Sequence, residues 1–207
     1  MIYLITGSAG FIGKKLVKKL VSNNHKVIGL DINYNNINHN NFFQFKVDLS
    51  NLKKIKKILF KFKKIDVLIH TSALQPINTE MNIFPYVKNN FIPAINILES
   101  VLEKKFKKII VCSSLSVYGK PKFNPISEND NLQPSNAYGF SKLLMEKTFE
   151  YYSKIYNLNM VILRFDGIFG YNQNMPGFIN MAIDTLINEQ KLILYNKGNQ
   201  KRNQVYV

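Results

Sequence analysis

The sequence contains a single cysteine, Cys112, so no disulfide can form within the chain. A chain without internal disulfides is typical of a reducing compartment. No apolar run reaches the length of a membrane-spanning helix. The chain begins directly with the strand-like MIYLITG and shows no basic region, long apolar region or cleavage site of a signal peptide. We therefore expect a cytoplasmic protein with no membrane segment.

Histidine and acidic residues are also scarce. The three histidines are scattered, and with one cysteine they form no metal-ligand pattern, so we expect no metal site. Lys and Arg number 28 against 13 Asp and Glu, which gives a net charge of +15. The lysines fall in short bursts such as Lys53–Lys57, which are typical of solvated helix faces. Because no nucleic-acid recognition motif accompanies them, we expect no nucleic-acid partner.

The 207 residues are enough for one sizeable core with a small additional lobe. Short apolar segments of strand character alternate with segments of helical periodicity. The predicted strands are Ile2–Thr6, Lys26–Asp31, Phe43–Val47, Val67–His70, Ile109–Ser113 and Asn159–Phe165, and the predicted helices are Phe11–Ser22, Leu52–Phe62, Asn89–Leu102 and Ala137–Tyr156. This alternation predicts an α/β fold, a Rossmann-type doubly wound parallel sheet with helices on both faces.

Three glycines, Gly7, Gly10 and Gly13, follow the first predicted strand in the segment GSAGFIG. Glycine at such positions allows a tight turn, a close approach of backbone amides to a pyrophosphate, and close packing of helix on sheet. The helix that follows presents free N–H groups and the positive end of its dipole to an anion. We interpret the segment as the phosphate loop of a dinucleotide site.

Asp31 ends the second predicted strand. A carboxylate at this place accepts hydrogen bonds from the adenosine ribose hydroxyls and repels a 2′-phosphate, which favours NAD over NADP. Taken alone, Asp31 could equally be a turn residue at the end of a strand, with no role in cofactor binding. Its place after the glycine segment favours the cofactor interpretation.

Tyr138 and Lys142 are four residues apart near the start of a predicted helix and therefore share a helix face. A surface pair explains many such spacings. We expect the Lys142 ammonium to lower the pKa of Tyr138 toward neutrality, which suits a general base or acid for a sugar hydroxyl. The fifth predicted strand ends in serines that face the cofactor crevice. We expect Ser114 to polarise the reacting oxygen, and Ser113 or Ser116 to cap the loop.

Taken in order, these segments resemble the NAD-dependent epimerase/dehydratase family, the extended short-chain dehydrogenases that act on nucleotide sugars. The resemblance covers essentially the whole chain. Its pieces are GSAGFIG, Asp31, Asp48-Leu49, His70-Thr71-Ser72-Ala73, Asn90, SSLSVYG, YGFSK, Leu163-Arg164 with Gly170, and GNQKRNQVYV.

The resemblance implies NAD as the cofactor and a role for each matched position. The implied cofactor residues are Gly7, Gly10, Phe11, Ile12, Gly13, Asp31, Ile32, Asn33, Asp48, Leu49, Thr71, Ser72, Ala73, Asn90, Tyr138 and Lys142. Asp48 and Leu49 would touch the adenine, and Asn90 would lie near the nicotinamide ribose. The implied catalytic residues are Ser114, Tyr138 and Lys142. The implied substrate residues are Ser114, Ser116 and Arg202. Arg202 would contact the substrate diphosphate. The interpretation of Arg202 as an ordinary exposed surface arginine is equally well supported.

The implied activity is epimerisation of a nucleotide sugar through a transient keto intermediate. In the 4,6-dehydratases of the family, Asp-Glu follows the catalytic hydroxyl, whereas Leu115 and Ser116 stand here, which argues against dehydration. Family members continue beyond GNQKRNQVYV. We therefore expect residues 1–170 to form the NAD-binding domain and residues 171–207 to be the truncated start of a small C-terminal substrate lobe. A homodimer that pairs through two helices is a further expectation of the resemblance.

Three alternatives stay open. An NAD(P)-dependent reductase or dehydrogenase acting on the same substrates would accumulate or consume reduced cofactor with turnover. A truncated, non-catalytic NAD-binding module would bind the cofactor without turnover. A nucleic-acid binder driven by the positive charge would show salt-sensitive binding.

Overall fold

The computed structural model describes residues 1–76, 82–104, 107–120, 125–171, 173, 177–194, 198–199 and 203–207. The chain divides into two compact units, Met1–Arg164 and Phe165–Val207. The division falls a few residues before the domain boundary that the sequence predicts at 170/171. Within the described ranges, no helix is both long enough and apolar enough to cross a membrane.

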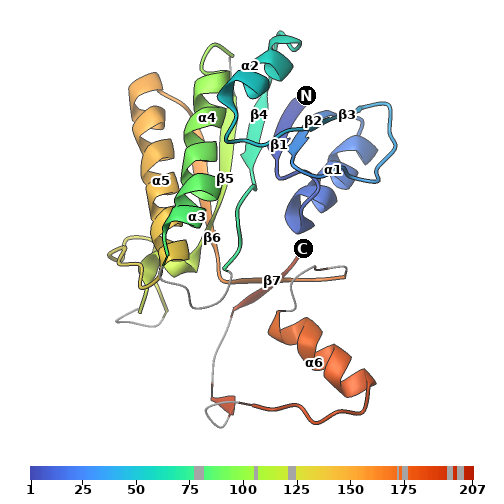
Figure 1. Ribbon diagram of the computed structural model, residues 1–207, viewed down its shortest axis with the longest axis vertical. Helices are drawn as coiled ribbons and strands as arrows, with labels where there is room; N and C mark the ends of the chain where they lie inside the picture. Colours follow the sequence, from blue (N-terminus) through green and yellow to red (C-terminus); the bar gives the residue numbers. More distant parts are fainter. Residues whose placement is uncertain are drawn as a thin grey trace. The chain divides into compact units, whose positions relative to one another are not determined.

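The first unit is built on a six-stranded sheet with the strand order β3-β2-β1-β4-β5-β6 (Figure 1). Its strands are β1 (Ile2–Thr6), β2 (Lys26–Asp31), β3 (Phe42–Lys46), β4 (Val67–His70), β5 (Lys108–Ser114) and β6 (Met160–Phe165). Its longer helices are α1 (Phe11–Ser22), α2 (Leu52–Phe60), α4 (Ile92–Val101) and α5 (Ala137–Tyr156). The strand order reverses between β1 and β4, as in dinucleotide-binding doubly wound sheets. The predicted fold class is confirmed.

The carboxyl ends of the central strands meet at one edge of this sheet. β1 pairs in parallel with β2 and β4, and β4 pairs in parallel with β5. In this register Thr6 lies opposite His70, and His70 lies opposite Val111. The segments that follow β1, β4 and β5 therefore leave the sheet side by side, at the edge where such sheets bind ligands.

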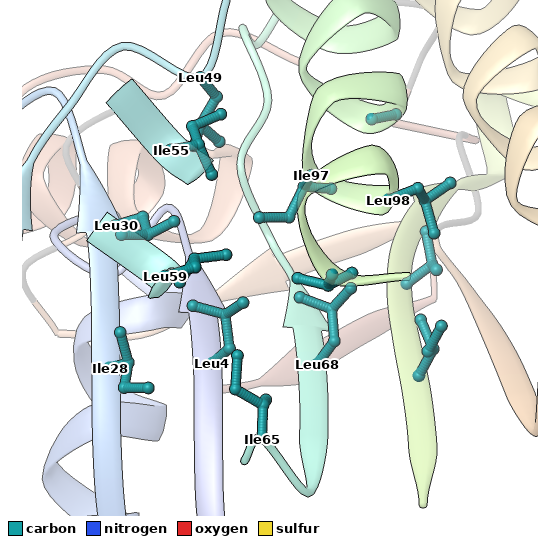
Figure 2. Packing of buried hydrophobic residues seen from close by; sticks show 14 of the residues in the cluster. Leu4, Ile28, Leu30, Leu49, Ile55, Leu59, Ile65, Leu68, Ile97 and Leu98 are labelled. Carbon is teal, nitrogen blue, oxygen red and sulfur yellow. The ribbon is translucent and has the colours of Figure 1, made fainter. Parts of the chain in front are cut away.

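Apolar side chains pack on both faces of the sheet. Leu4 of β1 belongs to a cluster that includes Ile55 of α2 and Ile97 of α4 (Figure 2). Its neighbour Ile5 packs in a second cluster with Val17 of α1. Successive side chains of a strand point to opposite faces, so β1 is apolar throughout because helices cover both faces.

The helical segment predicted over Asn89–Leu102 begins five residues earlier in the structure and consists of three consecutive elements. They are α3 (Phe84–Tyr86), the π-helical turn η1 (Val87–Phe91) and α4. Pro93 at the start of α4 has no amide hydrogen for an ordinary helical bond, and the wide turn ends just before it. A second short turn, the 3-10 helix η2 (Leu115–Tyr118), was not predicted and follows β5 directly.

The second unit contains α6 (Phe178–Ile187) and a two-stranded parallel sheet of β7 (Gly167–Phe169) and β8 (Gln204–Tyr206). The Asn203 amide donates to Asp166 Oδ2 at 2.9 Å. Ring centroids of Phe169 and Tyr206 are 5.5 Å apart. No residue of α6 is buried among the described residues.

His70, the last residue of β4, is fully buried beneath the ligand edge of the sheet. Its Nδ1 lies 2.8 Å from Thr6 Oγ1, and its ring contacts Phe149 at 5.3 Å between centroids. Burial lowers the pKa of His70 from 6.5 to about 3, and the positive charge of Lys142 acts in the same direction. His70 is therefore neutral in the folded chain at neutral pH.

This burial predicts a loss of stability in mild acid. Below pH 6.5 the unfolded chain binds a proton at His70 that the folded chain does not bind until about pH 3. Between about pH 7.5 and about pH 5.5, this histidine should lower the unfolding free energy by about 1.4 kcal/mol. Urea unfolding at both pH values should show that His70→Asn loses this part of the pH dependence, whereas the exposed His39→Asn keeps it. Equal pH dependence in wild type and His70→Asn would contradict the assignment.

Candidate active site

The glycine segment makes a tight turn between β1 and α1. Gly7 has a φ of +70°, a conformation that other residues rarely adopt. Its amide donates to the carbonyl of Leu30 on β2 at 2.9 Å. A Cβ on Gly13 would lie 2.0 Å from the carbonyl oxygen of Gly7. Helix α1 can therefore begin directly against the turn only because position 13 carries no side chain.

The N-terminus of α1 fits the pyrophosphate of a dinucleotide. Gly10 is its extended N-cap, and no side chain caps the helix or places an acidic group in its first turn. Phe11 and Ile12 are half-buried in that turn. The first-turn amides and the positive end of the helix dipole are thus left for an anion. This cradle fits the cofactor that the sequence predicts.

Asp31 lies beside the glycine turn, at the end of β2. Its Oδ2 accepts a hydrogen bond from the Ala9 amide, and its Oδ1 accepts one from the Asn33 amide, each at 2.9 Å. Ile32 and Asn33 are exposed next to it. The carboxylate is therefore hydrogen-bonded to the glycine turn. This position is consistent with the predicted contact between Asp31 and the adenosine ribose.

Asn35 also supports the glycine turn and was not singled out from the sequence. Its side chain is buried, and its Nδ2 donates to the carbonyl of Ser8 at 2.9 Å. Its backbone amide donates to Gln44 Oε1 at 2.8 Å. The surrounding loop is rich in asparagine, so nothing in the sequence distinguishes this asparagine from its neighbours.

The predicted adenine contacts differ in exposure. Asp48 is exposed, and its Oδ1 accepts a hydrogen bond from the Ser50 amide at 2.8 Å. Leu49 is buried in the core cluster with the residues of α2 and α4. Its backbone carbonyl accepts a bond from Asn96 Nδ2 at 2.8 Å. The Leu49 side chain therefore stabilises the core beneath this region.

The segment after β4 touches the glycine turn directly. Thr71 Oγ1 donates to the carbonyl of Thr6 at 2.7 Å. A Cβ on Gly7 would lie 2.8 Å from the Ser72 amide nitrogen, so the two backbones are in close contact. Thr71 and Ser72 therefore lie directly against the glycine turn at the edge of the sheet. A contact of Thr71, Ser72 and Ala73 with the cofactor stays a prediction.

Asn90 is fully buried in the π-helical turn and joins two parts of the site. Its Oδ1 accepts a hydrogen bond from the Leu74 amide at 2.6 Å. Its Nδ2 donates to Ser141 Oγ at 3.0 Å and to the carbonyl of Leu74 at 3.3 Å. The side chain thus ties the segment after β4 to α5. A contact between Asn90 and a nicotinamide ribose stays a prediction.

The first turns of α5 carry Tyr138 and Lys142. Asn136 caps the helix by accepting the Gly139 amide at 2.7 Å. A Cβ on Gly139 would lie 2.4 Å from the carbonyl oxygen of Ser116, so α5 begins in close contact with η2. Only 8% of Tyr138 and 2% of Lys142 is exposed. The surface-pair reading of this spacing is therefore wrong, because both residues are buried.

Ser114 lies against Tyr138 and starts η2. It forms a side-chain hydrogen bond with Tyr138. Its Oγ accepts the Ser116 amide and donates to Ser116 Oγ, both at 3.1 Å. The loop cap expected from Ser113 or Ser116 is thus made by Ser114 itself. Tyr138, Lys142 and Ser114 therefore meet at the carboxyl end of β5.

Burial controls the ionisation of this group. Lys142 Nζ donates to the carbonyl of Cys112 at 2.7 Å, and burial lowers the pKa of Lys142 to about 8. Burial also raises the pKa of Tyr138 above its usual value, and the hydrogen bond with Ser114 only partly opposes this. The prediction that Lys142 lowers the pKa of Tyr138 toward neutrality is wrong, because burial of the phenol dominates.

Arg202, the predicted substrate-diphosphate contact, lies outside the described residues.

Comparison with known proteins identifies the family of the chain. Residues 3–207 match the model of the NAD dependent epimerase/dehydratase family. A protein of Methanocaldococcus jannaschii, provisionally named UDP-glucose 4-epimerase, is 36% identical over 99% of this chain and 69% of its own length.

Two solved structures share the fold over essentially the whole of this chain. One is UDP-glucuronic acid 4-epimerase from Bacillus cereus in complex with UDP-glucuronic acid and NAD, with a TM-score of 0.87, 29% identity and coverage of 100% of this chain and 69% of that one. The other is UDP-N-acetylglucosamine 4-epimerase from Methanobrevibacter ruminantium in complex with UDP-N-acetylmuramic acid, with a TM-score of 0.87, 28% identity and coverage of 99% and 68%. The chain belongs to the NAD-dependent epimerase/dehydratase family.

Proposed function

We propose that this chain catalyses NAD-dependent epimerisation at C4 of the sugar of a UDP-hexose. The observation that carries the proposal is the meeting of Ser114, Tyr138 and Lys142 at the carboxyl end of β5. The glycine turn after β1 lies at the same edge of the sheet. A redox cofactor bound at the turn and a sugar hydroxyl at Tyr138 would thus share one crevice.

The residues around the glycine turn would hold NAD. The amides of the first turn of α1 would bind the pyrophosphate, and Asp31 would accept hydrogen bonds from the adenosine ribose hydroxyls. Lys142 and Asn90 would face the nicotinamide end. When bound, oxidised NAD supplies a two-electron acceptor and a positive charge that favours the phenolate of Tyr138.

The side chains at the end of β5 and the start of α5 would transfer the proton of the sugar hydroxyl. The Tyr138 phenolate would take the proton of the C4 hydroxyl as C4 is oxidised to a ketone, and would give it back in the reverse step. With the sugar bound, the Ser114 hydroxyl would turn from Ser116 Oγ and donate its hydrogen bond to the reacting oxygen. The ammonium of Lys142 would stabilise the phenolate. Epimerisation results if the keto sugar turns its opposite face toward the cofactor before the hydrogen returns to C4.

The segment after β5 favours epimerisation over dehydration. The family includes a dTDP-D-glucose 4,6-dehydratase of Dictyostelium discoideum that is 31% identical over 99% of this chain, so family membership alone does not choose the reaction. Dehydration needs an acid to protonate a leaving hydroxyl. Leu115 is aliphatic, and the Ser116 hydroxyl is hydrogen-bonded to Ser114. Neither residue supplies such an acid.

The broader organisation of the protein is part of the same proposal. Residues 1–170 would hold NAD, and residues 171–207 would belong to the lobe that holds the nucleotide sugar. Arg202 would contact its diphosphate. A homodimer and a cytoplasmic location stay predictions.

The assignment of Tyr138 predicts a selective loss of turnover. Replacement of Tyr138 by Phe removes the group that exchanges the proton but leaves the glycine turn intact. The rate should fall about 10²- to 10⁴-fold, while the dissociation constant of NAD changes less than about threefold. Interconversion of UDP-glucose, UDP-glucuronic acid and UDP-N-acetylglucosamine with their C4 epimers measures the rate, and calorimetry measures NAD binding. Tyr151→Phe, on the exposed side of the same helix, is the matched control. Unchanged turnover in Tyr138→Phe would exclude the proposed role.

The position of Asp31 predicts a preference for NAD. The wild-type chain should bind NAD more tightly than NADP, because the carboxylate repels a 2′-phosphate. Asp31→Asn should reduce the ratio of the two affinities by about tenfold, mainly by weakening NAD binding. Asp130→Asn alters a carboxylate in a distant loop and should leave the ratio unchanged. Equal wild-type affinities for the two cofactors would contradict the role of Asp31.

A further inference from the structure

A buried ion pair lies one helical turn beyond Lys142. Glu146 of α5 has no exposed surface, and Arg164 of β6 approaches both of its carboxylate oxygens. Arg164 Nη2 lies 2.9 Å from Oε2, and Arg164 Nε lies 3.2 Å from each oxygen. The pair is therefore a bidentate, charge-assisted contact within the protein.

The same guanidinium also binds η2. Arg164 Nη1 donates to the hydroxyl of Tyr118 at 2.6 Å, and the guanidinium carbon lies 5.0 Å from the centroid of the Tyr118 ring. Nη1 also donates to the carbonyl of Glu128 at 3.2 Å. We call Glu146, Arg164 and Tyr118 the Arg164 cluster.

The Arg164 cluster joins the two segments that carry the catalytic side chains. Tyr118 ends the turn that Ser114 begins, and Glu146 lies four residues after Lys142 on the same face of α5. One guanidinium thus holds η2 and α5 in a fixed relation. Small changes in such a relation alter proton transfer strongly, because the reacting groups must stay within hydrogen-bond reach.

Glu146 also places a negative charge near Lys142. The titratable groups that act on Lys142 come from two elements, Cys112 on β5 and Glu146 on α5. His70 on β4 also faces Lys142 but is neutral. Burial lowers the pKa of Lys142, and Glu146 opposes that decrease. Tyr86 of α3 faces Tyr138 itself, with ring centroids 6.1 Å apart. Glu146 is thus the one carboxylate in the described structure that acts on Lys142.

Stability alone does not explain such a cluster. Replacement of a buried ion pair by apolar side chains of similar size is often neutral or stabilising, because desolvation of two charges is costly. An apolar pair could fill the space between α5 and β6 equally well. The charged pair is therefore expected to serve the neighbouring site.

We propose that Glu146, held by Arg164, is a positioning residue for the catalytic group: it fixes α5 against η2 and places its charge beneath Lys142. This inference rests on the proposed function of Ser114, Tyr138 and Lys142. Its consequence is that Lys142 stays protonated over a wider pH range than burial alone would allow, and so can stabilise the Tyr138 phenolate.

The test compares Glu146→Gln with Glu150→Gln, which breaks the exposed ion pair between Lys147 and Glu150 on the same helix. Two quantities are measured in the full chain with NAD. One is the pKa of Lys142, followed by NMR of ¹⁵N-labelled lysine and assigned with Lys142→Arg. The other is the pH profile of kcat and KM with the UDP-hexose that wild type converts fastest.

Glu146→Gln should lower the pKa of Lys142 by about one unit and lower kcat by about tenfold at mildly alkaline pH. The loss should shrink as the pH falls, because Lys142 is then protonated in both proteins. KM and NAD affinity should change less than about twofold. Glu150→Gln should match wild type throughout. A purely structural role would instead give a loss of kcat that does not depend on pH.

A second variant covers the case in which Glu146→Gln unfolds. The double variant Glu146→Leu with Arg164→Met removes both charges and keeps an apolar contact, so it should fold. It should lower the pKa of Lys142 in the same direction but by less, because removal of the positive charge of Arg164 partly offsets removal of the negative charge of Glu146. An unchanged Lys142 pKa in either folded variant overturns the inference, whether or not the chain converts a UDP-hexose. Absence of turnover in wild type would refute the proposed function, and the Lys142 titration would still decide the inference.

Discussion

A protonated amine buried between a helix and a sheet determines the geometry of this site. Lys142 is almost completely buried, and an ammonium group in such a place is costly unless acceptors surround it. The carbonyl of Cys112 at the end of β5 provides one acceptor at 2.7 Å. This bond holds α5 at the carboxyl end of the sheet, and it brings Tyr138 of the same helix face toward Ser114. The glycine turn, the segment after β4 and the serine turn then surround one edge of the sheet.

Local patterns in the sequence were enough to predict this frame. The central strands are apolar because both of their faces are covered, so their positions follow from composition over a few residues. Gly7, Gly10 and Gly13 and the Tyr138–Lys142 spacing are equally local, since each depends on one turn or one helix face. The order of these pieces led to the family, which comparison with known proteins confirmed.

Interactions between distant segments could not be predicted in the same way. Asn35 is one asparagine among many in its loop, and only the fold shows that it binds Ser8. Arg164 belongs to a sequence motif of the sixth strand. Its partners Glu146 and Tyr118 lie 18 and 46 residues earlier in the chain, so a local pattern does not reveal these contacts. The pKa of Tyr138 was mispredicted because helix spacing reveals a neighbouring charge and gives no measure of burial.

The basic surface of the chain does not require a polyanionic partner. In the described structure the lysines of α2 lie on its exposed side, while Ile55 and Leu59 of the same helix are buried in the core. This amphipathic arrangement is that of an ordinary surface helix. Family membership does not identify the sugar, because the relatives are named for several.

Epimerisation requires that a single carbon is oxidised and then reduced again within one site. The most direct measurement follows deuterium placed at C4 of the UDP-hexose by NMR during turnover with NAD. Epimerisation at C4 should give a C4 epimer that keeps the deuterium at C4, with no accumulation of reduced cofactor. Transfer of the label to C6 would mean dehydration, and its loss to the cofactor would mean net oxidation. Either result, or tight NAD binding without conversion of any UDP-hexose, would contradict epimerisation by this site.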